Sequence, residues 1–483
     1  MGKDIVELEP LVLWSHFYNL TRIPRPSGHE EKVRAFVIDF SRTLGFETIQ
    51  DTAGNILIRK PAMQGMDNRK GVILQAHLDM VLQASAGSTH DFLNDPINAL
   101  VRGDIVTADG TTLGADNGIG VAAAMAVLES DSIPHGPLEV LFTANEEAGM
   151  TGALGLQPGL LQGDILLNLD SEEEGDLFIG CAGGLGGTMT FRCDRNPVPE
   201  GYTGVSISVS GLQGGHSGMD IHLGRGNANK IMNRILYQGY LRYGMLLASI
   251  DGGGLFNAIP RDSTAAVVVH SYNAELLIQH IADHAETIRQ EMILAEPELS
   301  IHAEMIDTPD SVMEEGAFFA LLKALYACPN GLIRMSDRIE GLVETSNNLA
   351  RVRSGDNEVT IECLLRSSLD SARDDLRTMI TCVFDLAGAQ SVYDEGYPGW
   401  RPEPDAAILE RMKDIYTATF GKTPGVKALH AGLECGIIGA IYPELEMISF
   451  GPTIRYPHSP HEMVDIASVS RFWDFLVATL GKL

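Results

Sequence analysis

The stretch "PLEVLFTANEEAG", Pro137 to Gly149, joins an apolar run to two adjacent carboxylates, Glu146 and Glu147. A short apolar run of this kind is typical of a strand that is buried on both faces. Consecutive residues of a continuing strand point to opposite faces, so both acids could not serve one site from a strand. We therefore expect the chain to turn already at Asn145, helped by Gly149, so that the two acids can act together in different roles.

Similar segments surround this stretch in the first third of the chain. Strand-like runs alternate there with helix-like ones, and a helix-period segment ends at Gly45. Strands separated by helices are typical of an α/β fold, here with a mainly parallel sheet covered by helices. The strand-like segments are residues 55–60, 71–80, 137–144 and 164–170, and the helix-like segments are residues 29–46 and 117–130.

The texture of the sequence changes near Gly184. From there small polar and apolar residues alternate, as in "GVSISVS" (204–210) and "TAAVVVH" (264–270), with helical stretches between them. After "GYPGW" (396–400) the pattern returns to that of the first region. The sequence therefore predicts a discontinuous first domain, residues 1–183 and 397–483, and an inserted α/β domain, residues 184–396.

The composition limits the possible partners and the location. Among 483 residues, 64 are acidic and 35 are basic, which gives a formal net charge of -29. Such a field disfavours nucleic acid and anionic membranes as partners but not divalent cations. The opening "MGKDIVELEPLVLW" lacks a signal-peptide pattern, and the six cysteines form no CxxC pair. We therefore expect a cytoplasmic protein.

Several strand-like segments end in side chains that can bind metal. Ligands of open α/β sheets gather at the carboxyl ends of the strands, so these side chains are expected to converge. One acid after a strand is commonly a turn or capping residue, but several successive cases favour a site. The residues concerned are His77, Asp79, Asp116, Glu146, Glu147 and Asp170.

The triplet His77-Leu78-Asp79 carries a further signal. Residues i and i+2 of a strand lie on the same side, so Asp79 could accept the second ring N–H of His77 and orient it. A carboxylate in that position is the usual partner of a metal-bound histidine. An exposed His–Asp pair is the alternative, and it fits poorly at the end of an apolar strand.

Two late segments add further candidate ligands. "GPTIRYPHSPHEM" contains His458 and His461, and "HAGLECG" contains His430 and Glu434. Histidine combined with several carboxylates is a typical ligand set for Zn²⁺, and Mn²⁺ or Co²⁺ are also compatible. The acid run "DSEEEGD", with Glu172 to Glu174, is expected to be a solvated loop.

Taken together, these motifs resemble a known enzyme family. "QAHLDM", "GADNGIG", "TANEEAGMTGA", "NLDSEEEG", "GGHSG" and "PHSPHE" are similar to the di-zinc family of dipeptidases, tripeptidases, aminoacylases and glutamate carboxypeptidases. The resemblance covers nearly the whole chain, and the order of the motifs is more specific than any one of them. It implies two divalent metal ions per chain and an inserted domain that serves as a lid and in a homodimer.

The resemblance also implies roles for individual residues. Asp116 would bridge both metal ions, His77 and Asp170 would complete one site, and Glu147 and His458 the other. Glu146 matches the general acid/base and Asp79 the acid that orients His77. This chain has His461 where the family pattern has an acid, which leaves a second imidazole beside His458. The resemblance favours His458, the first histidine of the motif, as the ligand.

Three residues of the inserted domain match substrate-binding positions of the family. His216 corresponds to a histidine that approaches the substrate or its oxyanion, either within its own chain or in a partner. Asn257 and Arg366 fall where relatives bind the substrate's carboxylate or carbonyl. A guanidinium suits the free carboxylate of a dipeptide, and a structural salt bridge is the open alternative for Arg366.

The resemblance implies a peptidase that hydrolyses dipeptides, including carnosine-like Xaa-His dipeptides. Metal-activated water would be the nucleophile and Glu146 the general base. Two alternatives stay open: a related metal-dependent aminoacylase or tripeptidase, and a non-catalytic metal-binding scaffold. A scaffold would be expected to lack the base or a ligand, and all these positions are intact here.

Overall fold

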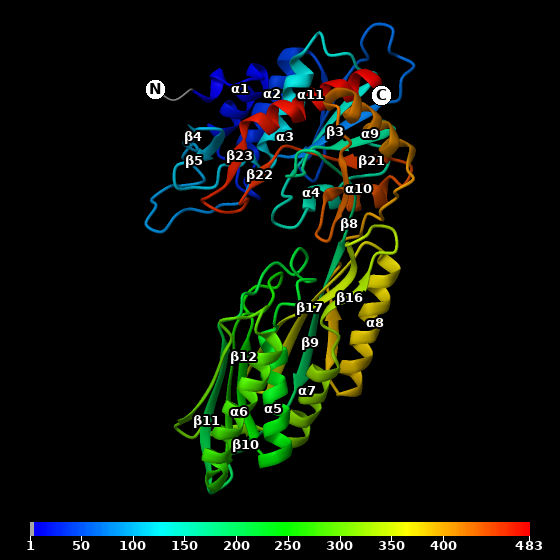
Figure 1. The fold of residues 1–483 in the computed structure, drawn as a ribbon. Helices are drawn as coiled ribbons and strands as arrows, with labels where there is room; N and C mark the ends of the chain where they lie inside the picture. Colours follow the sequence, from blue (N-terminus) through cyan, green and yellow to red (C-terminus); the bar gives the residue numbers. More distant parts are fainter. Residues whose placement is uncertain (1–3) are drawn as a thin grey trace. The chain divides into compact units, whose positions relative to one another are not determined.

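The computed structural model describes residues 4–483, so the first three residues of the N-terminal stretch lie outside the described part. Two compact units are present (Figure 1). The first comprises the chain up to Cys181 together with Trp400–Ala428 and Leu433–Leu483, and the second comprises Ala182–Gly399 and Leu429–Gly432. Residues 429–432 belong to the first domain in the division that the sequence predicts. They lie in the second unit because the backbone N–H of Ala182 donates to the carbonyls of Leu429 and Ala431.

The first unit is built on an eight-stranded sheet with the order β1-β2-β6-β3-β7-β21-β8-β20. Its strands are β1 (Glu47–Gln50), β2 (Ile56–Lys60), β3 (Val72–His77), β6 (Leu138–Thr143), β7 (Ile165–Asn168), β8 (Asp176–Cys181), β20 (Gly425–Leu429) and β21 (Glu446–Ser449). Its helical elements are η1 (Ile5–Glu7), α1 (Leu11–Thr21), α2 (Glu31–Leu44), α3 (Ala115–Glu129), α4 (Thr151–Leu154), α9 (Ala407–Phe420), α10 (Glu434–Ile441) and α11 (Ile466–Lys482).

The sheet is mixed, and the four strands at its centre are parallel. Strands β6, β3, β7 and β21 run parallel to one another, whereas β2 pairs antiparallel with β6, and β8 with β21. Every residue of β3, β6 and β7 is buried, as the uninterrupted apolar sequences predict. Because the central strands are parallel, their carboxyl ends meet at one edge of the sheet.

Helix α3 approaches the central strands closely because its sequence is rich in Ala and Gly. A side chain at Gly120 would meet the carbonyl oxygen of Leu169 at 2.7 Å, so only glycine fits there. Asp116 and Asn117 precede the regular part of the helix with non-helical backbone angles. This arrangement holds Asp116 at the start of α3, beside the ends of the strands.

A small second sheet of the first unit supports the segment that contains His458. Its order is β22-β23-β5-β4, with β4 (Ala99–Arg102), β5 (Ile105–Ala108), β22 (Ile454–Arg455) and β23 (Met463–Asp465). Strands β22 and β23 pair antiparallel, and His458 lies in the turn between them with a positive φ of 57°. Pairing of β23 with β5 ties this turn to the segment that leads into α3.

The second unit contains a nine-stranded sheet with antiparallel neighbours throughout. Helices α5–α8 cover the sheet, and the side chains between helices and sheet form an apolar core (Figure 1). The unit comprises β9 (Gly183–Arg192), β10 (Arg195–Pro197), β11 (Tyr202–Ser210), α5 (Ala228–Tyr243), β12 (Leu246–Gly252), β13 (Ser263–His270), η2 (Ser271–Asn273), α6 (Ala274–Met292), β14 (Ser300–Ile306), β15 (Ser311–Met313), α7 (Glu315–Ala327), β16 (Gly331–Met335), β17 (Val343–Ser354), β18 (Glu358–Ser367), α8 (Asp370–Leu386) and β19 (Gln390–Tyr393).

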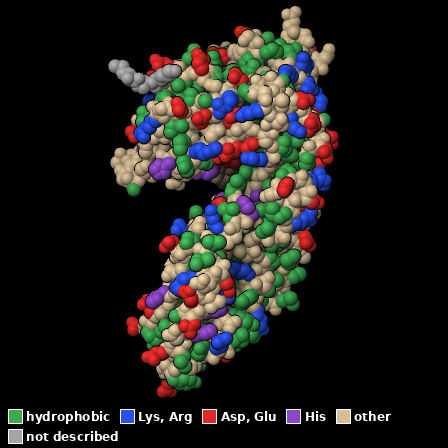
Figure 2. All heavy atoms as spheres, in the orientation of Figure 1, with side chains coloured by type: hydrophobic (Ala, Val, Ile, Leu, Met, Phe, Trp, Pro, Cys, Tyr) green, Lys and Arg blue, Asp and Glu red, His purple; other side chains and the backbone are tan. Residues whose placement is uncertain are grey.

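The surface agrees with the acidic composition. On the face drawn in Figure 2, lysine and arginine side chains lie scattered among acidic ones in both units, and no continuous basic patch is visible there. Within residues 4–483, no helix combines the length and apolar character needed to cross a membrane.

Candidate metal centre

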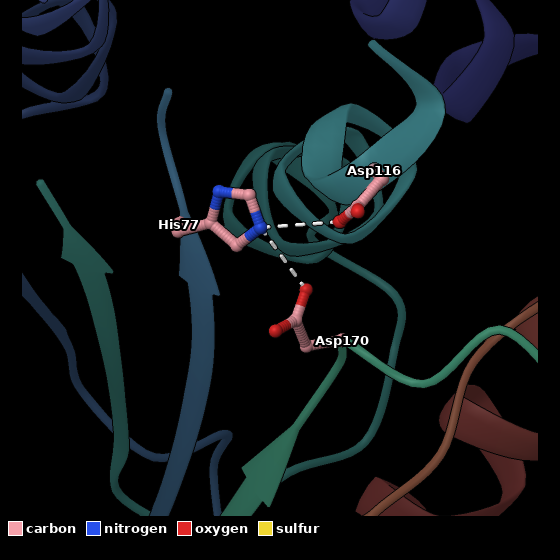
Figure 3. Close-up of side chains that lie close together, drawn as sticks. All are labelled: His77, Asp116 and Asp170. Carbon is pink, nitrogen blue, oxygen red and sulfur yellow. Dashed lines mark hydrogen bonds and ion pairs between the residues drawn. The ribbon is translucent and has the colours of Figure 1, made fainter. Parts of the chain in front are cut away.

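His77, Asp116 and Asp170 form the first cluster of candidate metal ligands. His77 is the last residue of β3, Asp116 lies at the start of α3, and Asp170 follows β7 (Figure 3). The Nε2 atom of His77 lies 3.1 Å from an oxygen of Asp116 and 3.3 Å from an oxygen of Asp170. The three side chains therefore direct one nitrogen and two carboxylates toward a common point.

Asp116, Glu147 and His458 form a second cluster. The Nε2 atom of His458 lies 3.2 Å from Oδ2 of Asp116 and 2.9 Å from Oε2 of Glu147. In each cluster the candidate ligand atoms lie within 4.8 Å of one another. Asp116 faces His77 with one carboxylate oxygen and His458 with the other, so it belongs to both clusters.

Asp79 fixes the turn that carries the Glu146–Glu147 pair. Strand β6 ends at Thr143, and Asn145 has a positive φ of 54°, so the chain turns where the sequence predicts. The backbone N–H groups of Glu146 and Glu147 donate to the two oxygens of Asp79 at 3.0 and 3.1 Å. The Nδ1 atom of His77 lies 3.4 Å from Asp79, longer than a strong hydrogen bond. Asp79 thus holds the acid pair at least as firmly as it holds His77.

Glu146 lies next to both clusters. It also forms a candidate group with His77 and Glu147, so geometry alone allows it to be a ligand or a free carboxylate. Burial, opposed by His77 and reinforced by the charges of Asp170 and Glu147, raises the pKa of Glu146 well above its usual range. A carboxyl group with such a raised pKa can hold a proton near neutral pH.

The electrostatics of the clusters show an excess of negative charge. Burial alone would lower the pKa of His77, but the carboxylates around it, Asp170 first, hold that pKa well above its usual value. Burial lowers the pKa of His458, but the hydrogen bonds of His458 to Asp116 and Glu147 outweigh this effect and raise the pKa to about 11. The imidazoles therefore act here as counter-ions of acids that are too close together to be stable without cations.

These residues fit divalent metal ions. Two imidazoles and three carboxylates are a suitable donor set for Zn²⁺ and for similar borderline cations. Oxygen Oε1 of Glu147 is buried and has no hydrogen-bond partner, which leaves a lone pair free for coordination. His461 is exposed and belongs to neither cluster, whereas His458 belongs to the second.

Glu462, the last residue of "PHSPHE", has a structural role that the sequence analysis did not assign. Its buried carboxylate accepts the backbone N–H groups of Leu113, Gly114, Ala115 and Asp116 at 2.7–3.2 Å. It lies four residues after His458, so it ties the His458 turn to the start of α3. Backbone amides at a helix start are a favourable partner for a carboxylate.

Arg25 was also missed, because nothing in its sequence surroundings distinguishes it. Its buried guanidinium donates to the carbonyls of Leu78 and Asp79 at 2.9 Å each, and also to the carbonyl of Gly114. Arg25 thereby links the segment after β3 with the segment before α3. The two segments that carry Asp79 and Asp116 are thus held together by a side chain from neither.

Residues Glu172 to Glu174 lie in the loop between β7 and β8, as predicted, but the prediction that the run is solvated is wrong for Glu172 and Glu174. All three are partly buried. Glu173 pairs with Arg455 at 2.9 Å, and Glu174 accepts from the hydroxyl of Tyr416 and from Arg471, both at 2.8 Å. Burial and the nearby carboxylates raise the pKa of Glu172 to about 9. The run reads as solvated in the sequence because its partners lie more than 240 residues away.

In the second unit, His216 and Asn257 lie on adjoining loop segments. His216 forms an isolated bridge with Ala258, and the carbonyl of Asn257 accepts the N–H of Ser217 at 2.8 Å. The Nδ1 atom of His216 accepts backbone N–H groups of Gly218 and Met219. A neutral imidazole whose Nδ1 accepts carries its proton on Nε2, which makes Nε2 a donor.

Arg366 lies on β18 and is 5% exposed. Its guanidinium donates to the hydroxyl of Tyr397 at 3.1 Å, and its Nε has no partner. No carboxylate among residues 4–483 lies within ion-pair distance of Arg366, so the structure gives no support for a structural salt bridge. A buried guanidinium without a carboxylate partner is a suitable donor for an external anion.

Comparisons with known proteins agree with this geometry. Residues 73–482 match the family described as "Peptidase family M20/M25/M40". The cytosol non-specific dipeptidase of Escherichia coli is 43% identical over 481 residues, which covers 100% of this chain and 99% of that protein.

Solved structures point the same way. The aminoacylhistidine dipeptidase of Vibrio alginolyticus shares 46% identity with a TM-score of 0.90, over 99% of this chain and 98% of that one. Aminopeptidase PepT of Bacillus cereus, at 15% identity and a TM-score of 0.63 over 98% and 99% of the two chains, shares the fold. The resemblance inferred from the motifs is confirmed. The chain belongs to the metallopeptidases of peptidase family M20/M25/M40.

Proposed function

We propose that this protein is a metal-dependent dipeptidase that hydrolyses dipeptides, including Xaa-His dipeptides. The observation that carries this proposal is the pair of clusters that share Asp116, in a chain similar over its full length to a dipeptidase. The aminoacylhistidine dipeptidase of Vibrio alginolyticus supports the Xaa-His preference, because its similarity also covers nearly the whole chain.

The clusters would hold two divalent ions per chain, most simply Zn²⁺, with Mn²⁺ or Co²⁺ as substitutes. His77 and Asp170 would bind one ion, Glu147 and His458 the other, and Asp116 both. Bound divalent ions supply Lewis-acid activation of water and of the scissile carbonyl. The protein's own contribution is to fix the five side chains through Glu462, Arg25 and Asp79.

Glu146 would move the proton. A general base must be a carboxylate that can release and regain a proton near neutral pH, and the raised pKa of Glu146 suits this task. Glu146 would take the proton of the attacking water and then deliver it to the amine nitrogen of the leaving residue. Asp79 would hold Glu146 in position through the backbone N–H of the turn.

Three residues of the second unit would bind the substrate. The Nε2–H of His216 is suited to donate to the developing oxyanion, and Asn257 offers an exposed amide beside it. The guanidinium of Arg366, whose Nε has no partner, is suited to the C-terminal carboxylate of a dipeptide. A group that binds the free carboxylate would favour short peptides, because their C-terminal carboxylate lies close to the scissile bond.

We further propose a cytoplasmic location and a homodimer. The six cysteines, which are all free and form no CxxC pair, support a reducing compartment. Sedimentation velocity of the purified protein tests the oligomeric state: a species of about 104 kDa supports the dimer, and a 52.2 kDa species contradicts it.

A substrate panel tests the proposed activity. The metal-free protein, reloaded with Zn²⁺, is offered Ala-His, β-Ala-His, a tripeptide and an N-acetyl amino acid. Hydrolysis of the two dipeptides that depends on reloading supports the proposal. Preferred hydrolysis of the tripeptide or the N-acetyl amino acid contradicts it in favour of a tripeptidase or an aminoacylase. Metal binding without any turnover contradicts it in favour of a scaffold.

A further inference from the structure

A row of polar side chains crosses the four central strands of the first unit. All of its members are buried, although they interrupt apolar strands. In the order of the strands β6, β3, β7 and β21 they are Thr143, Gln75, Asn168 and Ser449, and each is 0% exposed. Buried polar groups are costly unless they are hydrogen-bonded, so a row of four requires an explanation.

Two members of the row, Gln75 and Asn168, each lie two residues before a candidate metal ligand. Gln75 stands in register with Asn168, and Asn168 with Ser449. His77 lies two residues beyond Gln75 in the same strand and therefore on the same face. Asp170 follows Asn168 by the same number of residues, after β7 ends. Gln75 and Asn168 thus join β3 and β7 just before His77 and Asp170, and Thr143 of β6 stands in register with His77.

Glu434, the first residue of α10, anchors one end of the row. Its Oε2 accepts from Nε2 of Gln75 and from the hydroxyl of Thr143, both at 2.6 Å. Its side chain is fully buried, and its Oε1 has no partner. One carboxyl oxygen therefore holds the ends of β3 and β6 together, and these strands lead to His77 and to the Glu146–Glu147 turn.

The hydrogen bonds of the row all point toward Glu434. Nε2 of Gln75 faces Glu434 and donates to it, and the carbonyl of Gln75 faces Asn168. Asn168 then donates to Gln75 at 2.5 Å, and Ser449 donates to Asn168 at 2.5 Å. The hydroxyl of Ser171, 2.5 Å from that of Ser449, is left to donate at the far end. Glu434 thereby sets the orientation of every amide in the row.

Glu434 is also coupled electrically to the metal centre. Burial, with the charges of Asp170 and Asp79 and against that of His77, raises the pKa of Glu434 to about 8. This raised pKa favours the neutral form of the carboxyl in the protein without metal. A glutamine at this position can reproduce both the acceptor and the neutral charge.

We propose that Glu434 is a positioning residue of the metal centre, which acts through the polar row to keep the ligand-bearing strand ends in place. This inference rests on the proposed function only in taking the clusters to bind metal. Residues that support metal ligands in this way typically change metal affinity by 10–100-fold when they are removed.

Zn²⁺ affinity of the metal-free full-length protein tests this role, measured by competition with a chromophoric chelator. Glu434→Ala is expected to weaken Zn²⁺ binding by about 10–100-fold. Glu434→Gln is expected to retain most of the affinity, because its amide oxygen can accept from Gln75 and Thr143. Glu139→Ala is the matched control. Glu139 is a buried acid of the same sheet, at the opposite end of β6, and accepts from Arg59 at 2.9 Å.

The melting temperature of each metal-free variant separates positioning from stability. Both alanine variants are expected to melt lower, and only Glu434→Ala is expected to lose Zn²⁺ affinity. Equal Zn²⁺ affinities in Glu434→Ala and the control overturn the proposal. A loss in Glu434→Gln as large as that in Glu434→Ala also overturns it.

If Glu434→Ala does not fold, Glu434→Asp replaces it. Shortening the side chain withdraws the carboxyl from the row, so the Zn²⁺ affinity of Glu434→Asp must fall, and an unchanged value overturns the proposal. These outcomes are independent of the substrate panel. A wild-type protein that binds Zn²⁺ but cleaves no dipeptide contradicts the proposed function and leaves the role of Glu434 intact.

Discussion

The two units present their candidate functional residues in contrasting ways. In the first unit they stand at the ends of buried parallel strands, and backbone amides and buried side chains hold them in place, as Asp79 and Glu462 show. In the second unit His216 and Asn257 lie on loops, and Asn257 is exposed. A rigid centre suits metal ions, which need fixed ligand geometry, whereas loops suit groups that must adjust to a substrate.

The largest expected effect that separates the two regions concerns Glu462. Glu462→Gln keeps one acceptor oxygen and loses the other, so two of the four backbone N–H groups of residues 113–116 lose their partner. We expect Zn²⁺ affinity to fall by about 10–100-fold. Isothermal titration with Zn²⁺ measures this, and Glu344→Gln, at a buried acid of the second unit, is the control. Equal affinities of the two variants would show that Glu462 does not support the metal centre.

An intermediate effect is expected at Arg366. Arg366→Ala leaves the carboxylate of the substrate unpaired, which costs about 2 kcal/mol or more, or on the order of 30-fold in kcat/KM. Zn²⁺ affinity is expected to stay unchanged, since Arg366 belongs to the second unit. Steady-state kinetics with Ala-His and with its C-terminal amide provide the measurement.

The wild-type protein should prefer the free acid, and Arg366→Ala should lose that preference. The control is Arg351→Ala, which breaks an ion pair with Glu362 at 2.9 Å in the same sheet. A variant of Arg366 that still distinguishes the acid from the amide would rule out carboxylate binding by this residue.

The smallest expected effect concerns His430, which touches no metal cluster. Burial, together with the charges of Arg366 and His216, lowers the pKa of His430 to about 3. Its Nε2 lies 2.7 Å from the hydroxyl of Ser346. The unfolded chain binds a proton at His430 below pH 6.5 and the folded chain does not, so stability is complete above pH 6.5 and falls as the pH drops toward 3.

The slope from His430 alone is at most about 1.4 kcal/mol per pH unit in this window. His430→Gln is therefore expected to reduce the loss of stability between pH 7 and pH 5, measured as the urea midpoint at each pH. His302→Gln changes an exposed histidine and is expected to leave that loss unchanged. An unaltered pH dependence in His430→Gln would contradict the assignment of a neutral buried imidazole.

Much of the first unit could be predicted from the sequence, because its signals are local. Apolar runs that end in His77 or Asp170 mark both a buried strand and a polar group at its carboxyl end. The turn at Asn145 followed from the opposite faces of neighbouring strand residues. The predicted domain insertion rests on the change in sequence pattern near Gly184 and its return after "GYPGW".

The supporting residues could not be predicted, because their contacts are distant in sequence. Glu462 binds amides about 350 residues earlier, and Glu434 binds Gln75 at a separation of 359 residues. The acids Glu172 and Glu174 were misread for the same reason: a run of charge suggests solvent until its partners, such as Arg471, are known. Local sequence therefore identifies candidate metal ligands better than the residues that support those ligands.

The central claim is that Glu146 moves the proton while other residues bind the metal ions. One measurement tests this claim most directly. Glu146→Gln has nearly the same shape but can neither accept nor deliver the proton. Metal content by mass spectrometry and Ala-His turnover are measured on the same preparation of this variant and of the wild type. We expect an unchanged metal content of two ions per chain, as proposed for His77, Asp116, Glu147, Asp170 and His458, with turnover reduced to background. Turnover near the wild-type rate, or loss of metal together with activity, would contradict the account.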